Sequence, residues 1–395
     1  MFSNLPTPVL DPILSLSVAC RNDPRPNKVD LGIGVYKNSK GETPIMTAIK
    51  MAQDVVIENQ KTKSYVGLAG CEEFNQSMIE LVLAGTSVMD RVTAVQTPGA
   101  SGALRMLGDL MKVAQPDTTV WISNPSYVNH KPVMEAAGLK VKFYHYFSPE
   151  TKQVDIARML EDLSTAGPSD VVLLHGCCHN PTGADIDFAA WQLITELSQK
   201  NGFTPFVDIA YQGFGDGLEE DAKGLRYMAD NVDEMLITTS CSKNFGLYRE
   251  RTGAAIVVGK NAQEAANAKG KILTLARATY TMPPDHGAAL VKTILQDAHL
   301  TSVWKRELNE MQQRLVSLRQ VLCNELRNNH NTDQFDFIES HKGMFTVLGF
   351  SENQMTQLRE DYAIYGVGDG RINIAGLTET HIPYVADAIQ KVSQR

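Results

Sequence analysis

The chain lacks the features that mark secreted, membrane-bound and nucleic-acid-binding proteins. Basic residues are in deficit: 37 Lys and Arg stand against 45 Asp and Glu, which gives a formal net charge of -8. This charge argues against nucleic acid or an anionic membrane as a partner. No apolar run reaches the roughly 18 residues of a membrane helix, and the first residues lack a basic segment followed by an apolar one. We therefore expect a cytoplasmic protein with small-molecule ligands.

Paired cysteine motifs, internal repeats and low-complexity segments are missing too. The six cysteines contain no C-x-x-C motif, and a chain of 395 residues is large enough to fold without disulfides. We expect free thiols at Cys20, Cys71, Cys177, Cys178, Cys241 and Cys323. Hydrophobic residues make up 43% and charged residues 21%, which is typical of a globular protein with a large core. At about 150 residues per domain, this length corresponds to two or three domains.

The middle of the chain contains short apolar runs, each followed by turn or polar residues. Such runs, separated by helical stretches, predict a parallel α/β sheet that is buried on both faces. They lie at 120–122, 171–174, 205–207, 235–237 and 254–258. Ligands of such sheets bind beyond the carboxyl ends of the strands. Asp208, the loop with Asn180, and Lys243 are expected just past such ends.

Other segments predict the parts outside this sheet. Residues 1–12 contain three prolines and predict an extended arm that a partner subunit could cover. Apolar residues spaced by four and three predict a core helix over 303–326. Beyond 331, strands expected at 335–338, 344–348 and 371–374 alternate with helices, as in an α+β domain. We expect a small domain of 13–46 plus 310–395 and a large domain of 47–309.

Lys243 is the most informative residue. The apolar run 235–237 and the small residues Ser240, Cys241 and Ser242 precede it, so it stands near the end of a buried strand. A buried lysine is costly to desolvate unless it has a task. The task that fits is a Schiff base with an aldehyde cofactor.

A phosphate site and a carboxylate accompany this lysine. The glycine-rich turn at 97–104 opens a helix, and its backbone N–H groups, with Ser101, Ser240 and Arg251, form a candidate phosphate site. Asp208 ends an apolar run and could face a pyridinium nitrogen, although such an aspartate can also cap a helix. Tyr211 could donate a hydrogen bond to a phenolate oxygen of the same ring.

Two further groups are candidates for ligand binding. The stretch 175–183 is rich in His and Cys but lacks the paired spacing of a structural zinc site, so we expect no metal and a turn that presents Asn180. Arg371 lies in an apolar strand, where a substrate carboxylate could be its bidentate partner. Arg277 is a second candidate for binding a carboxylate.

Together these motifs resemble the class I pyridoxal-phosphate aminotransferases, and in particular their bacterial aspartate and aromatic branch. The likeness runs from Asp11 to Gly376 and includes 31–37, 123–126 and 212–214. It implies the type I fold of pyridoxal-phosphate transferases, which is like that of aspartate aminotransferase. This is an α/β fold with a mostly parallel sheet in the large domain and a smaller α+β domain.

The resemblance implies pyridoxal 5'-phosphate as the cofactor. Lys243 would form the internal aldimine and then carry the proton, and Asp208 would pair with the pyridine nitrogen. Asn180 and Tyr211 would hydrogen-bond the 3' oxygen. The phosphate ligands would be Gly99, Ala100, Ser101, Ser240 and Arg251, with Tyr65 of a neighbouring subunit in a homodimer.

The same resemblance implies the substrate contacts. Arg371 would bind the α-carboxylate with help from Gly34 and Asn180, and Arg277 would cross the subunit interface to a distal carboxylate. His130 matches a histidine behind Asp208, and His175 matches one near the cofactor.

The sequence departs from the family pattern at positions that affect substrate fit. Tyr127 stands where the family usually stacks a tryptophan on the cofactor ring, which leaves a smaller π-face. Ser64, Ser101 and Met282 resemble the aromatic-accepting branch, whereas Lys37 and Thr43 resemble the aspartate branch.

We predict ping-pong transamination of tyrosine, phenylalanine and tryptophan and of dicarboxylic amino acids, with 2-oxoglutarate as acceptor. An aspartate-specific aminotransferase is the first alternative. A pyridoxal-phosphate lyase could share Lys243 and Asp208 but would have less use for Arg277. A non-catalytic binding module would not need Lys243, Asp208 and Tyr211 together.

Overall fold

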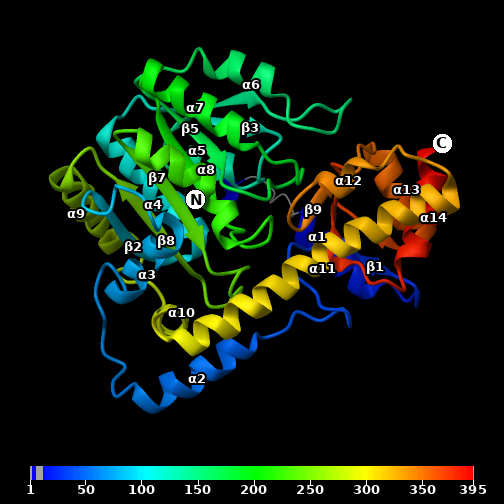
Figure 1. Cartoon of the computed structure of the whole chain (residues 1–395), viewed down its shortest axis with the longest axis horizontal. Coiled ribbons are helices and arrows are strands. Elements are labelled where there is room, and N and C mark those ends of the chain that lie inside the picture. Colours follow the sequence, from blue (N-terminus) through cyan, green and yellow to red (C-terminus); the bar gives the residue numbers. More distant parts are fainter. Residues whose placement is uncertain (1, 6–11, 395) are drawn as a thin grey trace. The chain divides into compact units, whose positions relative to one another are not determined.

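The computed structural model describes residues 2–5 and 12–394 (Figure 1). The chain forms two compact units, one of residues 1–43 with 315–395 and one of residues 44–314. We expected boundaries after residues 46 and 309, and these units end at residues 43 and 314. The division into two domains stays a prediction. Within the described residues, no helix combines the length and apolar character needed to cross a membrane.

A seven-stranded sheet is the centre of residues 44–314, in the order β2-β8-β7-β6-β5-β3-β4. Its strands are β2 (Val92–Pro98), β3 (Thr119–Asn124), β4 (Lys140–His145), β5 (Asp170–His175), β6 (Thr204–Ile209), β7 (Met235–Ser240) and β8 (Thr252–Val258). Five neighbouring strands of this order, β7, β6, β5, β3 and β4, pair with one another in parallel. The predicted α/β fold with a mostly parallel sheet is therefore confirmed.

One strand runs against this expectation. β8 pairs antiparallel with both β7 and β2, although the run 254–258 was expected in a parallel sheet. A parallel pair needs a crossover connection, usually a helix. The connection from Ser240 to Thr252 contains no helix, so the chain turns back and β8 runs antiparallel.

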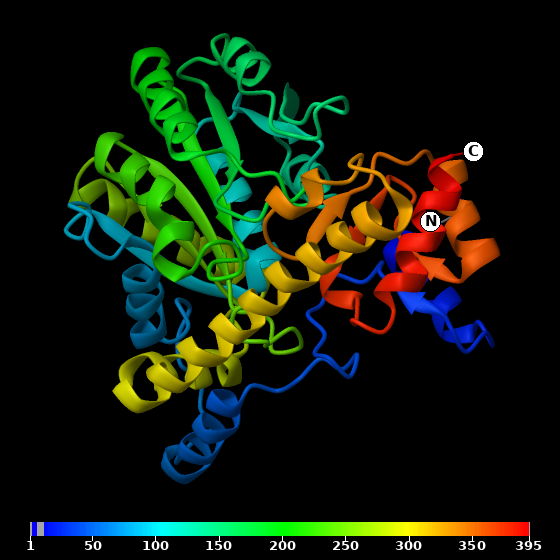
Figure 2. The same cartoon turned by 45° about the vertical axis from the view of Figure 1, so that its right-hand side comes forward.

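Helices cover the sheet (Figures 1 and 2). They are α3 (Glu72–Leu83), α4 (Gly99–Ala114), α5 (His130–Ala136), α6 (Ile156–Leu163), α7 (Phe188–Asn201), α8 (Leu218–Asn231), α9 (Ala262–Thr279) and α10 (Asp285–Gln296). α2 (Thr47–Asn59) packs against α10 instead. α7 shows why its bounds fall where they do: the Asp187 carboxylate accepts the Ala190 N–H, and Gly202 ends the helix at φ 81°. Every residue of β7 and β8 is buried, which explains their unbroken apolar runs.

The long helix α11 (Ala298–His330) contributes residues to both units. The predicted helix over 303–326 is present but begins earlier. The Asp297 carboxylate accepts the Leu300 N–H, which is a start signal that apolar spacing does not reveal.

The other unit combines short helices with two small sheets. β1 (Val29–Asp30) pairs in parallel with β10 (Ile364–Tyr365), and β9 (Phe345–Val347) pairs antiparallel with β11 (Arg371–Asn373). Its helices are α1 (Pro12–Asn22), α12 (Phe337–Ser340), α13 (Glu352–Tyr362) and α14 (Ile382–Ser393), with 3-10 turns η1 at Phe2–Asn4 and η2 at Ile374–Gly376.

One expectation for this unit was wrong, and another falls largely outside the described residues. The strand expected at 335–338 is a turn that leads into α12, because Phe335 and Ile338 are buried three residues apart, which is turn and helix spacing. The extended arm expected at 1–12 lies largely outside the described residues. Where it is described, Phe2–Asn4 form a 3-10 turn and α1 begins at Pro12.

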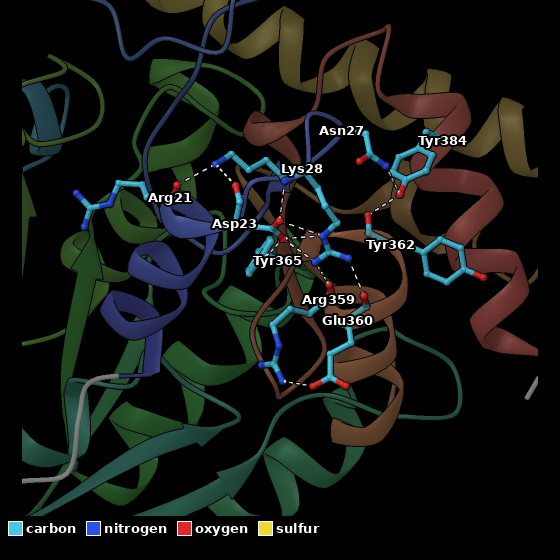
Figure 3. A network of polar contacts seen from close by, with 10 residues as sticks. Arg21, Asp23, Asn27, Lys28, Arg359, Glu360, Tyr362, Tyr365 and Tyr384 are labelled. Carbon is cyan, nitrogen blue, oxygen red and sulfur yellow. Dashed lines mark hydrogen bonds and ion pairs between the residues drawn. The ribbon is translucent and has the colours of Figure 1, made fainter.

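A polar network ties the loop after α1 to the end of α13 and to β10 (Figure 3). The Arg25 guanidinium donates to the Asp23 carboxylate at 2.6 Å and to the Glu360 and Arg359 carbonyls. The Tyr365 hydroxyl donates to the same carboxylate at 2.6 Å. Hydrogen bonds from Arg25 and Tyr365 hold the pKa of Asp23 below its usual range, so the carboxylate stays charged.

Removing the Tyr365 hydroxyl should weaken this unit. Tyr365→Phe removes one hydrogen bond to a carboxylate and should cost about 1 kcal/mol of unfolding free energy. Tyr362→Phe is the matched control, because no hydrogen bond of its hydroxyl is recorded among the described residues. Urea unfolding measures both variants, and equal midpoints for the two would contradict the network.

Candidate active site

Lys243 stands on a braced turn. The turn follows β7 directly, and Gly246 donates its N–H to the Lys243 carbonyl at 2.9 Å with φ 66°. The buried Trp304 donates its indole N–H to the Asn244 carbonyl at 2.7 Å and stacks on Phe245, with ring centroids 4.4 Å apart. The lysine therefore projects from a fixed backbone.

The surroundings of Lys243 favour its neutral form. Burial lowers the pKa of Lys243 to about 8, with Asp208 raising it and Arg251 lowering it. Its Nζ lies 4.9 Å from the centre of the Tyr211 ring. A lysine with this pKa has an appreciable neutral fraction near neutral pH, which makes it a competent nucleophile and base.

Asp208 is a buried carboxylate that stays ionised. It lies within β6 and not past its end as we expected. Thr238 Oγ1 donates to its Oδ1 at 2.7 Å, and its Oδ2 is 2.9 Å from His130 Nε2. Burial raises the pKa of Asp208, but the hydrogen bonds and charge of His130 outweigh it, so the pKa is lowered overall.

A single chain of hydrogen bonds runs from Asn180 to Asp208. The Asn180 N–H is 3.4 Å from His175 Nδ1, His175 Nε2 is 3.2 Å from Ser126 Oγ, and Ser126 Oγ is 2.9 Å from His130 Nδ1. Burial lowers the pKa of His175 to about 3, so its ring is neutral.

This chain fixes the tautomers. An amide N–H can only donate, so His175 Nδ1 accepts and its Nε2–H donates to Ser126. Ser126 then donates to His130 Nδ1, and His130 Nε2–H donates to Asp208. All donors in this chain point toward the Asp208 carboxylate, which favours its charged form.

An anion site fits the start of α4. No side chain caps this helix, whose first turn contains Ala100 and Ser101. Gly99 has φ 69°, and a Cβ there would lie 2.6 Å from Arg251 Nη2, so only glycine lets the guanidinium approach the helix end. A Cβ on Gly253 would likewise lie 2.8 Å from Ala100 N. Backbone N–H groups and a guanidinium at one helix N-terminus suit a phosphate.

Other predicted residues lie near this cluster. Ser240 is buried at the end of β7, and its Oγ accepts the Ser242 N–H at 3.1 Å. Asn180 and Tyr211 are also buried. Tyr127 meets His130 edge-on, with ring centroids 5.3 Å apart and an interplanar angle of 89°. A carboxylate, a tyrosine, an amine and an anion site together suit a flat aromatic cofactor that carries a phosphate.

Two predicted residues lie on the surface. Tyr65 is 86% exposed in the segment after α2, and Arg277 is exposed in the last turn of α9. Within the described part of the chain, no recorded hydrogen bond or ion pair joins either one to the Lys243 cluster.

In the other unit, Arg371 is buried on β11. Its Nη2 donates to the Gly32 carbonyl at 3.1 Å, and its guanidinium carbon lies 4.6 Å from the centre of the Phe345 ring. Gly34 packs against the same ring, since a Cβ there would lie 3.3 Å from Phe345 Cζ. Phe345 was not among the predicted site residues. A phenylalanine in a short apolar strand has no local pattern that marks it as a partner of an arginine.

A cluster that was not predicted lies between the loop after β5 and the first turn of α8. Cys177, Cys178 and Asp221 have ligand atoms within 4.8 Å of one another. The contact with Cys178 and burial raise the pKa of Cys177 well above its usual value, which disfavours a thiolate. The Asp221 oxygens accept N–H groups of Gly213, Gly215 and Asp216. We assign this carboxylate to holding the loop.

The reactivity of Lys243 should reveal its depressed pKa. In cofactor-free protein, reductive methylation of Lys243, followed by mass spectrometry over a pH series, should have its midpoint near pH 8, because burial lowers the pKa to about 8. The control is an acetyl-lysine amide, whose amine titrates near ~10.4. Equal midpoints for the two amines would refute the altered environment.

Comparison with known proteins identifies the family of this chain. Residues 26–389 match the family model described as aminotransferase class I and II. The chain is 45% identical to an aromatic-amino-acid aminotransferase of Paracoccus denitrificans, covering 99% of this chain and 100% of that one. It is 42% identical to an aspartate aminotransferase of Escherichia coli (strain K12), with coverage of 99% and 100%.

A solved structure is similar along the whole chain. It is an aromatic-amino-acid aminotransferase of Burkholderia pseudomallei covalently bound to pyridoxal phosphate, with a TM-score of 0.97, 36% identity and 99% coverage of both chains. With a matching family model over most of its length and relatives above 40% identity, the chain belongs to the class I and II aminotransferases.

Proposed function

We propose that this aminotransferase uses pyridoxal 5'-phosphate to transfer the amino group of aromatic and dicarboxylic amino acids to 2-oxo acids, with 2-oxoglutarate as acceptor. The observation that carries the proposal is the pairing of a lysine of depressed pKa with an ionised, buried Asp208 beside an anion site. The pyridoxal phosphate bound to the Burkholderia relative supports the choice of cofactor.

Each part of the cluster would hold one part of the cofactor. Lys243 is the proposed point of covalent attachment, Asp208 would hold a proton at the ring nitrogen, and Tyr127 would cover one ring face. Asn180 and Tyr211 would donate to the ring oxygen. The proposed phosphate ligands are Gly99, Ala100, Ser101, Ser240 and Arg251. When bound, the cofactor supplies an electron sink for the bond broken at the substrate Cα.

Lys243 would do the proton transfer. Its pKa of about 8 lets the neutral amine accept the α-proton near neutral pH and return it afterwards. General acid–base transfer of this kind is typically worth about 10²–10⁴-fold in rate. The chain from Asn180 to Asp208 would keep the carboxylate oriented and charged while the proton moves.

Arginines would recognise the substrate carboxylates. Arg371 would bind the α-carboxylate beside Gly34, which lies in the same unit. Arg277 would bind the distal carboxylate of glutamate or aspartate across a subunit interface, and Tyr65 would reach the partner's phosphate. Both are exposed in the single chain, which supports these roles in a homodimer.

Exposed apolar side chains support the homodimer as well. They gather along 45–66, where Ile45, Val55, Ile57 and Val66 are exposed. A groove of about 690 Å³ beside them is lined by residues of α2, of the segment after it and of α10. Apolar patches of this kind usually mark an interaction surface.

The substrate choice rests on the family resemblance of two residues and on the relatives. Ser64 and Met282, two positions that resemble the aromatic-accepting branch, both line the same groove. Relatives with both specificities are about equally similar, at 45% for the aromatic enzyme and 42% for the aspartate enzyme. A few side chains shift selectivity by only about 1–3 kcal/mol, so we propose dual specificity, with an aspartate-specific enzyme as the alternative.

Cofactor attachment tests the site. After incubation with pyridoxal phosphate and reduction with borohydride, the peptide that contains Lys243 should carry the cofactor. Lys243→Ala should lose that adduct and at least about 10²-fold in turnover. Lys140→Ala, at an exposed lysine on the edge strand β4, should keep both. An unlabelled Lys243 peptide in the parent protein would falsify the assignment.

Kinetics test the role of Arg277. Arg277→Ala should lower kcat/KM for aspartate about 10²-fold, because a charged partner of the distal carboxylate is lost. The value for phenylalanine should change less than about 3-fold. Single-turnover assays of the amino-donor half-reaction, without acceptor, measure both values, since Arg277 would also bind the distal carboxylate of 2-oxoglutarate. If the parent enzyme turns over aspartate and barely accepts phenylalanine, the aspartate-specific alternative holds.

A further inference from the structure

Phe345 presents its ring to the Arg371 guanidinium inside the protein. The guanidinium carbon lies 4.6 Å from the ring centre, and the two residues are only 2% and 4% exposed. A cation over an aromatic face is attracted to the ring, and the attraction is stronger when the pair is desolvated. Because both side chains are buried, the pair of Arg371 and Phe345 is desolvated.

Strand pairing explains why the two side chains meet. β9 and β11 are antiparallel, and Phe345 is paired with Asn373. Arg371 lies two residues from Asn373, on the same face of β11, so it is the diagonal neighbour of Phe345. Diagonal neighbours are within reach of aromatic and long side chains.

A second buried arginine fixes the backbone of Phe345. Arg319 on α11 is 2% exposed, and its Nη2 donates to the Phe345 carbonyl at 2.7 Å and to the Gly343 carbonyl at 2.8 Å. Its Nη1 donates to the Ile338 carbonyl at 3.1 Å. These bonds hold the segment that carries the ring.

The ring also contacts the segment that carries Gly34. Asn373 Nδ2 donates to the Ile33 and Val35 carbonyls at 2.7 and 2.8 Å, and Arg371 donates to the Gly32 carbonyl. A Cβ on Gly34 would lie 3.3 Å from Phe345 Cζ. The ring is thus packed between the Gly34 backbone and the guanidinium.

We propose that Phe345 is a positioning residue that sets the plane of the Arg371 guanidinium and thereby its affinity for the substrate α-carboxylate. The proposal rests on the role proposed above for Arg371. All guanidinium N–H bonds lie in its plane, so fixing that plane fixes the line along which a carboxylate can form two parallel bonds. An aromatic face stabilises the charge without entering that plane.

The test compares a carboxylate with its uncharged counterpart. In the holoenzyme, inhibition constants are measured for 3-phenylpropanoate and for 3-phenylpropanamide, and their ratio isolates the contribution of the charge. Phe345→Leu should reduce the preference for the carboxylate about 10-fold, within the range of a buried cation–π contact. The constant for the amide should change less than about 2-fold.

A fluorinated series separates the π-face from packing. Phenylalanine 345 is replaced by 3-fluoro- and then 3,5-difluorophenylalanine, which weaken the ring's negative face at nearly constant size. The carboxylate preference should fall stepwise, whereas the cofactor spectrum should stay unchanged. This series remains decisive if Phe345→Leu does not fold.

The outcomes distinguish this inference from the proposed function. The role of Phe345 would be overturned if the carboxylate preference did not change across the fluorinated series. It would also be overturned if the amide lost as much affinity as the carboxylate. A parent enzyme that fails to transaminate phenylalanine or aspartate overturns the proposed function. A graded carboxylate effect in that enzyme would still support the role of Phe345.

Discussion

The structure of the candidate site depends on keeping one negative charge inside the protein. Asp208 is buried on a central strand, where an isolated carboxylate would take up a proton. Thr238 and the ordered chain through His130, Ser126 and His175 prevent this by pointing donors at it. The same charge acts on Lys243, whose pKa reflects both burial and Asp208. The electrostatics of the amine and of the acid are therefore coupled.

The arrangement follows from how a parallel sheet is built. Residues at the carboxyl ends of β5, β6 and β7 come together at one edge although they are far apart in sequence. The apolar runs, together with the family resemblance, therefore predicted Asp208, Asn180 and Lys243 at this edge, although Asp208 lies within β6 and not past its end. Gly99 could be predicted from a local pattern, because a glycine-rich turn before a helix is visible in the sequence. Its positive φ explains why glycine is required there.

Other features could not be predicted, because they depend on pairing between distant segments. The direction of β8 depends on a connection without a helix, and apolar content does not reveal strand direction. Ser126 and Thr238 look like ordinary polar residues until the register places them beside His130 and Asp208. The same holds for Phe345, whose contact with Arg371 follows from the pairing of β9 with β11. The strand expected at 335–338 shows that apolar residues in a short run do not separate a turn from a strand.

The contact between Arg371 and the Gly32 carbonyl joins residues 339 positions apart in sequence. The pairing of β1 with β10 spans a similar distance. During synthesis at about 5–20 residues per second, the early segment must wait for tens of seconds before its partners leave the ribosome. The unit formed by 44–314 is one continuous stretch, whose Thr47 N–H waits for the Glu307 carboxylate 260 positions later, so it can be completed before residues 315–395 leave the ribosome. The unit that contains Arg371 is thus the last region that a nascent chain can complete.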